Sequence, residues 1–97
     1  MTRRKISRCV SFDPKTTYFK PQGIPLRLLE EVVIEKDELE AIKLYEVDNK
    51  SQIDAAKEMN ISQPTFARIL DSANKKIAHA LIYGKAIKLQ NNDHIQY

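Results

Sequence analysis

Residues 60–70, NISQPTFARIL, constrain the fold of this chain more than any other short segment. Pro64 stands where an apolar pattern of helical spacing begins. Proline breaks a helix from the inside but is tolerated in the first turn, where its missing amide hydrogen would have no partner. Ser62 is a favourable N-cap residue. The segment therefore predicts a helix that starts at Gln63, with Pro64 in its first turn.

The predicted third helix is long and has two different sides. Gly84 is a good stop signal, so the helix is expected to cover residues 63–83. Ile61 and Phe66 stand at the two positions of a hydrophobic staple. At 100° per residue, the apolar side consists of Phe66, Ile69, Leu70, Ala73, Ile77 and Ala80. The opposite side carries Pro64, Arg68, Asp71 and Lys75, with Gln63 and Ala67 at one edge and Ser72 at the other.

Two shorter helices are predicted upstream. The first covers about residues 38–47, with Asp37 as N-cap and Glu40 as the capping-box partner. Its interior positions are Leu39, Ile42 and Val47, with Tyr45 beside them. The second covers about residues 52–59, with Ser51 as N-cap. Its inward-facing residues are Ala55, Ala56 and Met59.

The connection between the second and third predicted helices is three residues long. Asn60 tolerates the left-handed backbone that a tight turn needs, and Ala56 is small where the two helices would cross. Two helices with such a turn, the second strongly capped, are typical of a helix-turn-helix. The same pattern also fits a plain pair of helices that binds nothing.

The remaining segments have β character. Residues 1–29 contain three prolines and Gly23, which exclude a long helix. Residues 9–12, 16–25 and 31–35 are extended or β-type runs, and residues 86–90 predict a last strand that pairs with the N-terminal β-segment. The predicted fold class is mainly α: a three-helix helix-turn-helix core with short N-terminal β-segments and a C-terminal strand. With 97 residues the chain is a single domain, divided at 1–36, 37–83 and 84–97.

Charge is distributed unevenly along the chain. Residues 1–29 hold seven basic groups and one acid, residues 30–60 hold ten acids and four lysines, and residues 61–97 hold five basic groups and two acids. An acidic middle between basic ends suggests that both ends face one polyanion. The alternative is ordinary solvated charge.

The exposed side of the third helix carries groups that suit DNA. A recognition helix contacts bases with its N-terminal residues. Arg68 can hold guanine O6 and N7, and Gln63 can do the same to an adenine. Thr65 and the amides of the first turn suit a phosphate. Lys75 and Lys76 lie further along and are expected to meet the DNA backbone.

Some of these assignments have alternatives. Arg68 can equally be an exposed charge paired with Asp71 or Ser72, and Asp71 repels phosphate unless it accepts from a cytosine or holds Arg68. The basic arm of Thr2, Arg3, Arg4 and Lys5 can enter a minor groove or contact phosphates, or it can be a tail that aids solubility. The predicted DNA-binding residues are Ser62, Gln63, Pro64, Thr65, Ala67, Arg68, Asp71, Lys75, Lys76, Arg3, Arg4 and Lys5.

Four motifs together resemble uncharacterised protein family 0251, a family of small predicted DNA-binding proteins of archaea and bacteria. They are TYFKPQGIP, DELEAIKL, AAKEMNISQPTFARIL and KKIAHALIYGKAIKL, and the similarity runs over about residues 3–89. The helical half is also similar to the DNA-binding region four of sigma factors. The resemblance implies a sigma-like helix-turn-helix after an N-terminal β-segment. The chain departs from the family pattern at Gln63, where arginine is usual, and at Asn49 and Ala67, where glycine is frequent.

Other classes of function lack their usual sequence signals. Neither His79 nor His94 has a nucleophile or carboxylate at a telling spacing, and Cys9 alone makes neither a disulfide nor a zinc site. The chain has two glycines and no glycine-rich phosphate loop, and no apolar run approaches the roughly 20 residues of a membrane span. We therefore expect no enzyme activity, cofactor, metal, small-molecule substrate or membrane partner. A cytoplasmic location is expected because no apolar signal core follows the basic N-terminus.

Two functions remain open from the sequence. The first is a DNA-binding transcription regulator that reads the major groove of double-stranded DNA as a homodimer, because two half-sites multiply affinity. The second is a sigma-like protein-interaction module that docks on the transcription machinery. Its docking surface would be the acidic segment 30–48, with Glu38 and Glu46 among the contacts.

Overall fold

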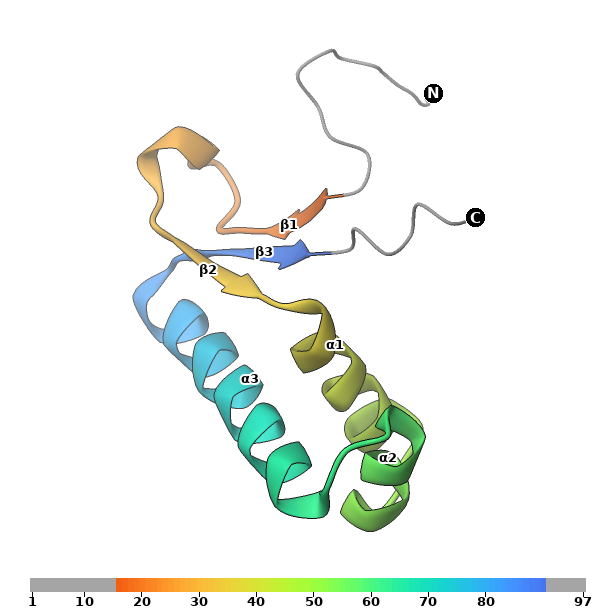
Figure 1. Ribbon diagram of the computed structural model, residues 1–97. Helices are drawn as coiled ribbons and strands as arrows, with labels where there is room; N and C mark the ends of the chain where they lie inside the picture. Colours follow the sequence, from red (N-terminus) through yellow and green to blue (C-terminus); the bar gives the residue numbers. More distant parts are fainter. Residues whose placement is uncertain (1–15, 91–97) are drawn as a thin grey trace.

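The chain builds three helices and a small sheet (Figure 1). The computed structural model describes residues 16–90. Its strands are β1 (Thr16–Phe19), β2 (Glu31–Ile34) and β3 (Ala86–Gln90), and its helices are α1 (Lys36–Ile42), α2 (Gln52–Met59) and α3 (Gln63–Tyr83). A 3-10 turn, η1 (Leu26–Leu28), precedes β2, and a π-helical turn, η2 (Lys43–Val47), follows α1. The predicted mainly α fold is confirmed, whereas the predicted β-type run at 9–12 lies outside the described residues.

Strand β3 is the centre of the sheet although it comes last among the described elements. It runs antiparallel to β1, with Tyr18 opposite Lys88, and parallel to β2, with Val33 opposite the same lysine. All three helices lie in the connection between β2 and β3. The sheet is at one end of the molecule, and α2 and the beginning of α3 are at the other end (Figure 1). The predicted pairing of the last strand with the N-terminal β-segment is confirmed.

Helix α3 has the bounds that its local signals predict. Ser62 Oγ accepts a hydrogen bond from the Thr65 backbone N–H at 3.3 Å, and Pro64 lies in the first turn. Gly84 ends the helix with a φ of +67°, a conformation that glycine adopts without steric cost. The buried residues of α3 are Phe66, Leu70, Ala73 and Ala80. The predicted apolar side is therefore the side that faces the rest of the molecule.

A three-residue turn, residues 60–62, connects α2 to α3 as predicted. Asn60 has φ +63° and ψ +42°, which is the left-handed conformation. The Ile61 N–H donates to the Ala56 carbonyl oxygen at 3.0 Å and satisfies an acceptor at the end of α2. Ser51 Oγ accepts from the Asp54 N–H at 3.0 Å and caps the other end of that helix. The turn thus joins two helices whose ends are both closed by hydrogen bonds.

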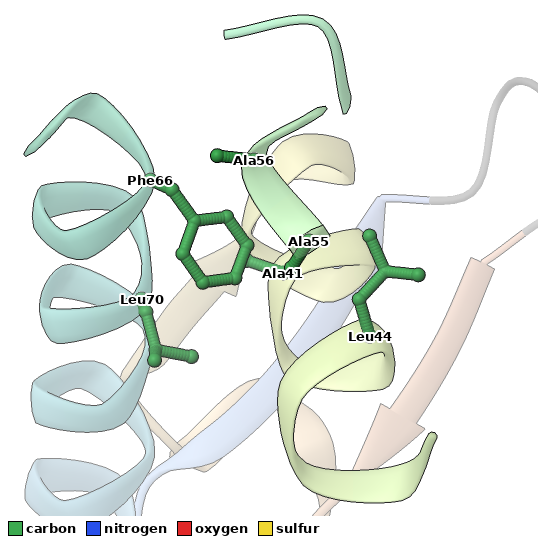
Figure 2. Close-up of a cluster of buried hydrophobic side chains, with 6 residues drawn as sticks. All are labelled: Ala41, Leu44, Ala55, Ala56, Phe66 and Leu70. Atoms are coloured by element: carbon green, nitrogen blue, oxygen red, sulfur yellow. The ribbon is translucent and has the colours of Figure 1, made fainter. Parts of the chain in front are cut away.

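One apolar cluster holds α1, η2, α2 and α3 together (Figure 2). Its buried members are Ala41, Leu44, Ala55, Ala56, Phe66 and Leu70. The Phe66 ring projects from α3 toward α1 and α2 and has no exposed surface. Full burial of a phenylalanine side chain contributes roughly 1.5–3 kcal/mol. Small alanines around the ring allow the helices to approach it closely, so packing at this ring fixes how α3 is turned.

Helix α1 begins earlier than predicted. Its N-cap is Glu35 rather than Asp37, and the capping-box partner is Glu38 rather than Glu40. The Glu35 backbone N–H donates to Glu38 Oε1 at 2.8 Å. The same carboxylate also binds side chains of α3, so a tertiary contact favours this cap over the local alternative at Asp37.

The end of the first predicted helix is π-helical rather than α-helical. A π-helical turn is wider, so η2 rotates the side chains that follow away from their places on an α-helical wheel. Leu44 is buried, whereas Val47, predicted to face the core, is 69% exposed. Asn49 then takes a φ of +59°, a left-handed conformation that suits the glycine frequent at this position in the family that the sequence resembles.

Candidate nucleic-acid interface

The first two turns of α3 leave one side open at the end of the molecule opposite the sheet (Figure 1). The predicted DNA-contacting residues there are Ser62, Gln63, Pro64, Thr65, Ala67 and Arg68; Thr65 and Ala67 are half-buried and the others are exposed. Phe66 points to the opposite side, into the apolar cluster. The burial of this ring therefore leaves the polar side of the helix start accessible to a large ligand.

Three side chains on this side form a short polar chain. Ser62 Oγ donates to Thr65 Oγ1 at 2.9 Å, and Arg68 Nη2 approaches the same oxygen at 3.4 Å. Because Thr65 Oγ1 accepts from both neighbours, its own O–H stays available for another acceptor, such as a phosphate oxygen. A guanidinium has five N–H donors, so Arg68 keeps most of them for a partner as well.

Arg68 forms no ion pair with any residue in the range 16–90. Asp71, one of its two predicted partners, binds Lys75 Nζ at 3.1 Å instead, and Ser72, the other, donates to Glu38 at 2.7 Å. The Asp71–Lys75 pair has the favourable i,i+4 order and is exposed, so it contributes about 0.3–0.5 kcal/mol. This pairing also offsets the negative charge that Asp71 would present to a phosphate.

A second contact joins the starts of α2 and α3. Gln63 Nε2 donates to Gln52 Oε1 at 2.6 Å, and these two residues are the first of their helices. The sequence did not single out Gln52 as a functional residue. Gln52 and Gln63 are the same residue type at the first position of two consecutive predicted helices, and this match could have identified Gln52 from the sequence.

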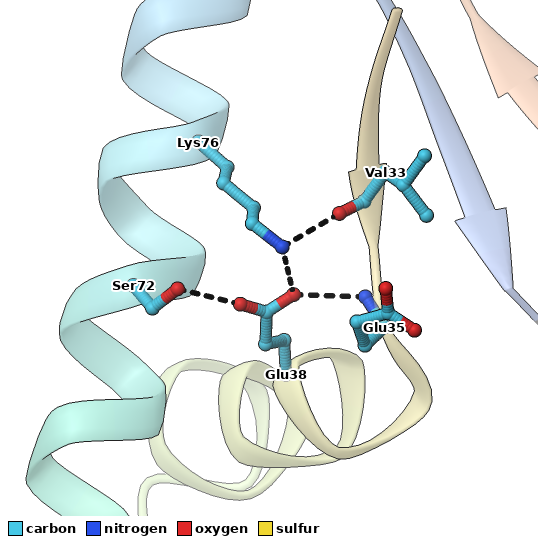
Figure 3. A network of polar contacts seen from close by, with 5 residues as sticks. All are labelled: Val33, Glu35, Glu38, Ser72 and Lys76. Carbon is cyan, nitrogen blue, oxygen red and sulfur yellow. Dashed lines mark hydrogen bonds and ion pairs between the residues drawn. The ribbon is translucent and has the colours of Figure 1, made fainter.

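Lys76, by contrast, belongs to an internal network between α3, α1 and β2 (Figure 3). Its Nζ lies 2.8 Å from Glu38 Oε1 and donates to the Val33 carbonyl oxygen at 2.8 Å. Ser72 and the Glu35 backbone N–H complete the ligands of the Glu38 carboxylate. Lys76 is half-buried and its ammonium is bonded to Glu38 and Val33, so the predicted contact with the DNA backbone stays a prediction and would require these bonds to be broken or shared.

Glu38 is the only buried charged residue in the described part of the chain, with 6% of its surface exposed. Burial by itself would raise the pKa of this carboxyl. Hydrogen bonds from Lys76, Ser72 and the Glu35 amide, together with the charge of Lys76, outweigh the burial and hold the pKa below its usual value. The carboxylate thus stays ionised and locks α1 to the middle of α3.

The position of Glu38 also removes one contact of the alternative docking surface. Glu38 was expected to face a protein partner, but its two oxygens are used within the fold. Glu46 is exposed. Two other acids of the segment are paired: Lys43 binds Asp48 at 2.9 Å, which raises the pKa of the lysine through that hydrogen bond, and Lys85 binds Glu30 at 2.9 Å. The acidic segment is thus less uniform in charge than its sequence suggests.

The basic arm Arg3, Arg4 and Lys5 lies outside the described residues, as do Cys9 and His94. Within residues 16–90 no three His, Cys, Asp or Glu side chains are grouped so that they could hold a metal ion. None of the helices built by these residues has the length and apolar character needed to cross a membrane.

The fold and the open helix side define a small, mainly α protein with a three-stranded sheet and an accessible polar face. By sequence, the chain belongs to the family described as "Protein of unknown function DUF134", whose model matches residues 1–97. It is 52% identical over 90 residues to a UPF0251 protein of Moorella thermoacetica, an alignment that covers 93% of this chain and 60% of that protein.

Other relatives carry the same family name. A UPF0251 protein of Caldanaerobacter subterraneus is 48% identical over 90 residues, covering 93% of this chain and 76% of the relative. One of Thermoanaerobacter pseudethanolicus is 41% identical over 97 residues, covering the whole chain and 82% of the relative. The chain thus spans less than two thirds of the length of the Moorella protein and more than two thirds of the length of the other two relatives. No solved structure matches the chain.

Proposed function

We propose that this protein is a DNA-binding transcription regulator in which α2, the three-residue turn and α3 act as a helix-turn-helix. The start of α3 would lie in the major groove. The observation that carries the proposal is that Arg68 is exposed on the open side of α3 and has no acidic partner within the described residues. An unpaired guanidinium in the second turn of such a helix suits the two acceptors of a guanine edge.

The neighbours of Arg68 support the same orientation. Thr65 keeps a hydroxyl donor, and the N-terminal end of a 21-residue helix carries partial positive charge, which favours a phosphate. Gln63 lies on the same side, in the first turn. The apolar cluster around Phe66 holds this side outward, so DNA would meet a preformed surface.

The proposal includes a homodimer on DNA, because two half-sites one helical turn apart multiply the affinity of a small reading surface. Light scattering of the complex with a duplex that carries two half-sites would then give two chains per duplex. The cytoplasm is the proposed location, because DNA is the proposed partner.

The function is tested by selecting bound duplexes from a random pool and titrating the most enriched duplex with purified protein. We expect affinity to fall steeply as salt rises, because phosphate contacts release counterions. Arg68→Ala should weaken binding to the selected duplex by about 1–3 kcal/mol. Lys20→Ala is the matched control, because it removes one exposed positive charge next to β1, at the sheet end of the molecule (Figure 1). Equal binding by wild type and Arg68→Ala, or no enrichment of any duplex, would contradict the proposal.

A further inference from the structure

The contact between the starts of α2 and α3 points to a base preference. We propose that Gln52 and Gln63 act as one unit that selects an adenine–thymine base pair. In this unit Gln63 reads the adenine, and Gln52 is a positioning residue that orients the Gln63 amide. The inference rests on the proposed DNA-binding function and adds a residue and a base identity to it.

The geometry restricts an amide that would otherwise be free. Gln63 is exposed and Gln52 is half-buried, yet Gln63 Nε2 lies only 2.6 Å from Gln52 Oε1. A long exposed side chain normally samples several rotamers, and binding must offset the entropy lost when it is ordered. A partner on the neighbouring helix orders Gln63 before DNA arrives. Because the turn and the apolar cluster fix α2 against α3, the partner itself is held in place.

A count of donors and acceptors leads from this geometry to adenine. A glutamine amide has two N–H donors and one oxygen that accepts. The bond to Gln52 uses one N–H of Gln63, which leaves one N–H and the oxygen. Adenine offers an acceptor at N7 and a donor at N6 in the major groove, which are the complements of these two groups. Guanine offers acceptors at both N7 and O6, so the glutamine oxygen would face another oxygen.

With the Gln52 oxygen turned toward Gln63, the bond also fixes the orientation of the Gln63 amide. A flip of Gln63 alone would place its oxygen against Gln52 Oε1, so that two acceptors would face each other. The two N–H groups of the Gln52 amide are not used in this bond and suit a phosphate oxygen beside the base pair. Gln52 therefore has two separate roles: its oxygen orients the Gln63 amide, and its N–H groups can bind a phosphate. A substitution that keeps only the oxygen tests the first role alone.

The test measures affinity for the selected duplex and for a series in which each base pair is replaced in turn. With wild type, replacing one A·T pair by G·C should weaken binding about 5- to 150-fold. That discrimination should disappear in Gln63→Ala and shrink several-fold in Gln52→Ala. Gln52→Glu keeps the acceptor oxygen but adds negative charge, so it should bind all duplexes more weakly and retain the A·T preference. Arg68→Ala is the control that should lower affinity but keep this preference.

The possible failures are distinguishable. If wild type binds DNA but Gln63→Ala keeps every base preference, the inference is wrong and the proposed function stands. The same holds if Gln52→Ala discriminates as strongly as Gln52→Glu, because the acceptor would then have no effect on readout. If wild type binds no duplex at all, the proposed function fails, and the base preference fails with it.

Discussion

Arg68 and Lys76 are two cations on one helix, eight residues apart, and their surroundings differ completely. Among the described residues, Arg68 makes one long hydrogen bond, to Thr65 at 3.4 Å, whereas Lys76 is bound to Glu38 and to the Val33 carbonyl at 2.8 Å each. The difference does not come from the local sequence of α3. It comes from Glu38 of α1 and Val33 of β2, which lie against the side of α3 that carries Lys76, whereas Arg68 is on the open side of the helix start. A count of positive charges along a helix therefore overestimates the number of cations that are free to meet a ligand.

The two regions are also stabilised in different ways. The start of α3 is held by local hydrogen bonds at Ser62 and by the buried ring of Phe66, and its polar side remains open. The middle is held by the Glu38 carboxylate, which has three hydrogen-bonding partners: Ser72 and Lys76 of α3 and the backbone N–H of Glu35, the N-cap of its own helix. Damage to the middle should lower stability, whereas damage to the open side should lower binding.

Phe66→Ala should have the largest effect because the ring is fully buried between three helices. We expect the free energy of unfolding to fall by about 3–5 kcal/mol, measured by denaturant titration. The start and the middle of α3 should unfold together in this variant. Leu81→Ala is the matched control: this side chain is 72% exposed, so the change should stay within about 0.5 kcal/mol. A near-neutral Phe66→Ala would mean that α3 is turned differently about its axis.

Glu38→Ala should separate stability from binding. Loss of the carboxylate leaves Lys76, Ser72 and the Glu35 amide without their shared acceptor, at a cost of about 2–4 kcal/mol of unfolding free energy. At a temperature where the variant is folded, its affinity for the selected duplex should equal that of wild type. Lys76→Met should behave in the same way. If Lys76→Met instead had native stability and weakened DNA binding, Lys76 would be a DNA-contacting residue.

Acid should remove part of the same stabilisation. Because the pKa of Glu38 is lowered in the folded state, the unfolded chain binds its proton first as pH falls. The contribution is complete above the ordinary value near 4.5 and is lost as the pH drops through the folded-state pKa. Unfolding experiments between pH 7 and 3 should show wild type losing more stability than Glu38→Gln, which cannot ionise. Parallel curves for the two proteins would show that this carboxylate has no special role.

Ser62→Ala should have the smallest of these effects. It removes the acceptor for the Thr65 N–H and should lower the free energy of unfolding by about 1 kcal/mol. Ser62→Asp keeps an acceptor at the N-cap and should restore the stability. If the Ser62→Ala and Ser62→Asp variants are equally stable, the cap contributes nothing and the start of α3 is held by Phe66 alone.

The features that were predictable from the sequence are those set by neighbouring residues. Ser62, Pro64 and Gly84 define α3 through bonds and conformations within a few positions, and its bounds are correct. The cap of α1 and the role of Lys76 were not predictable, because Glu38 meets residues 34 and 38 positions away. The exposure of Val47 was missed for a related reason, because nothing in the local pattern marks the wider turn of η2. For the site, the composition of the open side was predictable, but the Gln52–Gln63 contact required the packing of α2 against α3.

The central claim is that the start of α3 reads DNA with its open side. The most direct test is to titrate ¹⁵N-labelled protein with the selected duplex and follow the backbone amide signals of residues 16–90. We expect the largest shifts in the first two turns of α3 and at Gln52, with small shifts at β1 and in the network around Glu38. Shifts centred on the sheet or on the exposed acids of α1 and η2, with α3 unaffected, would contradict this account.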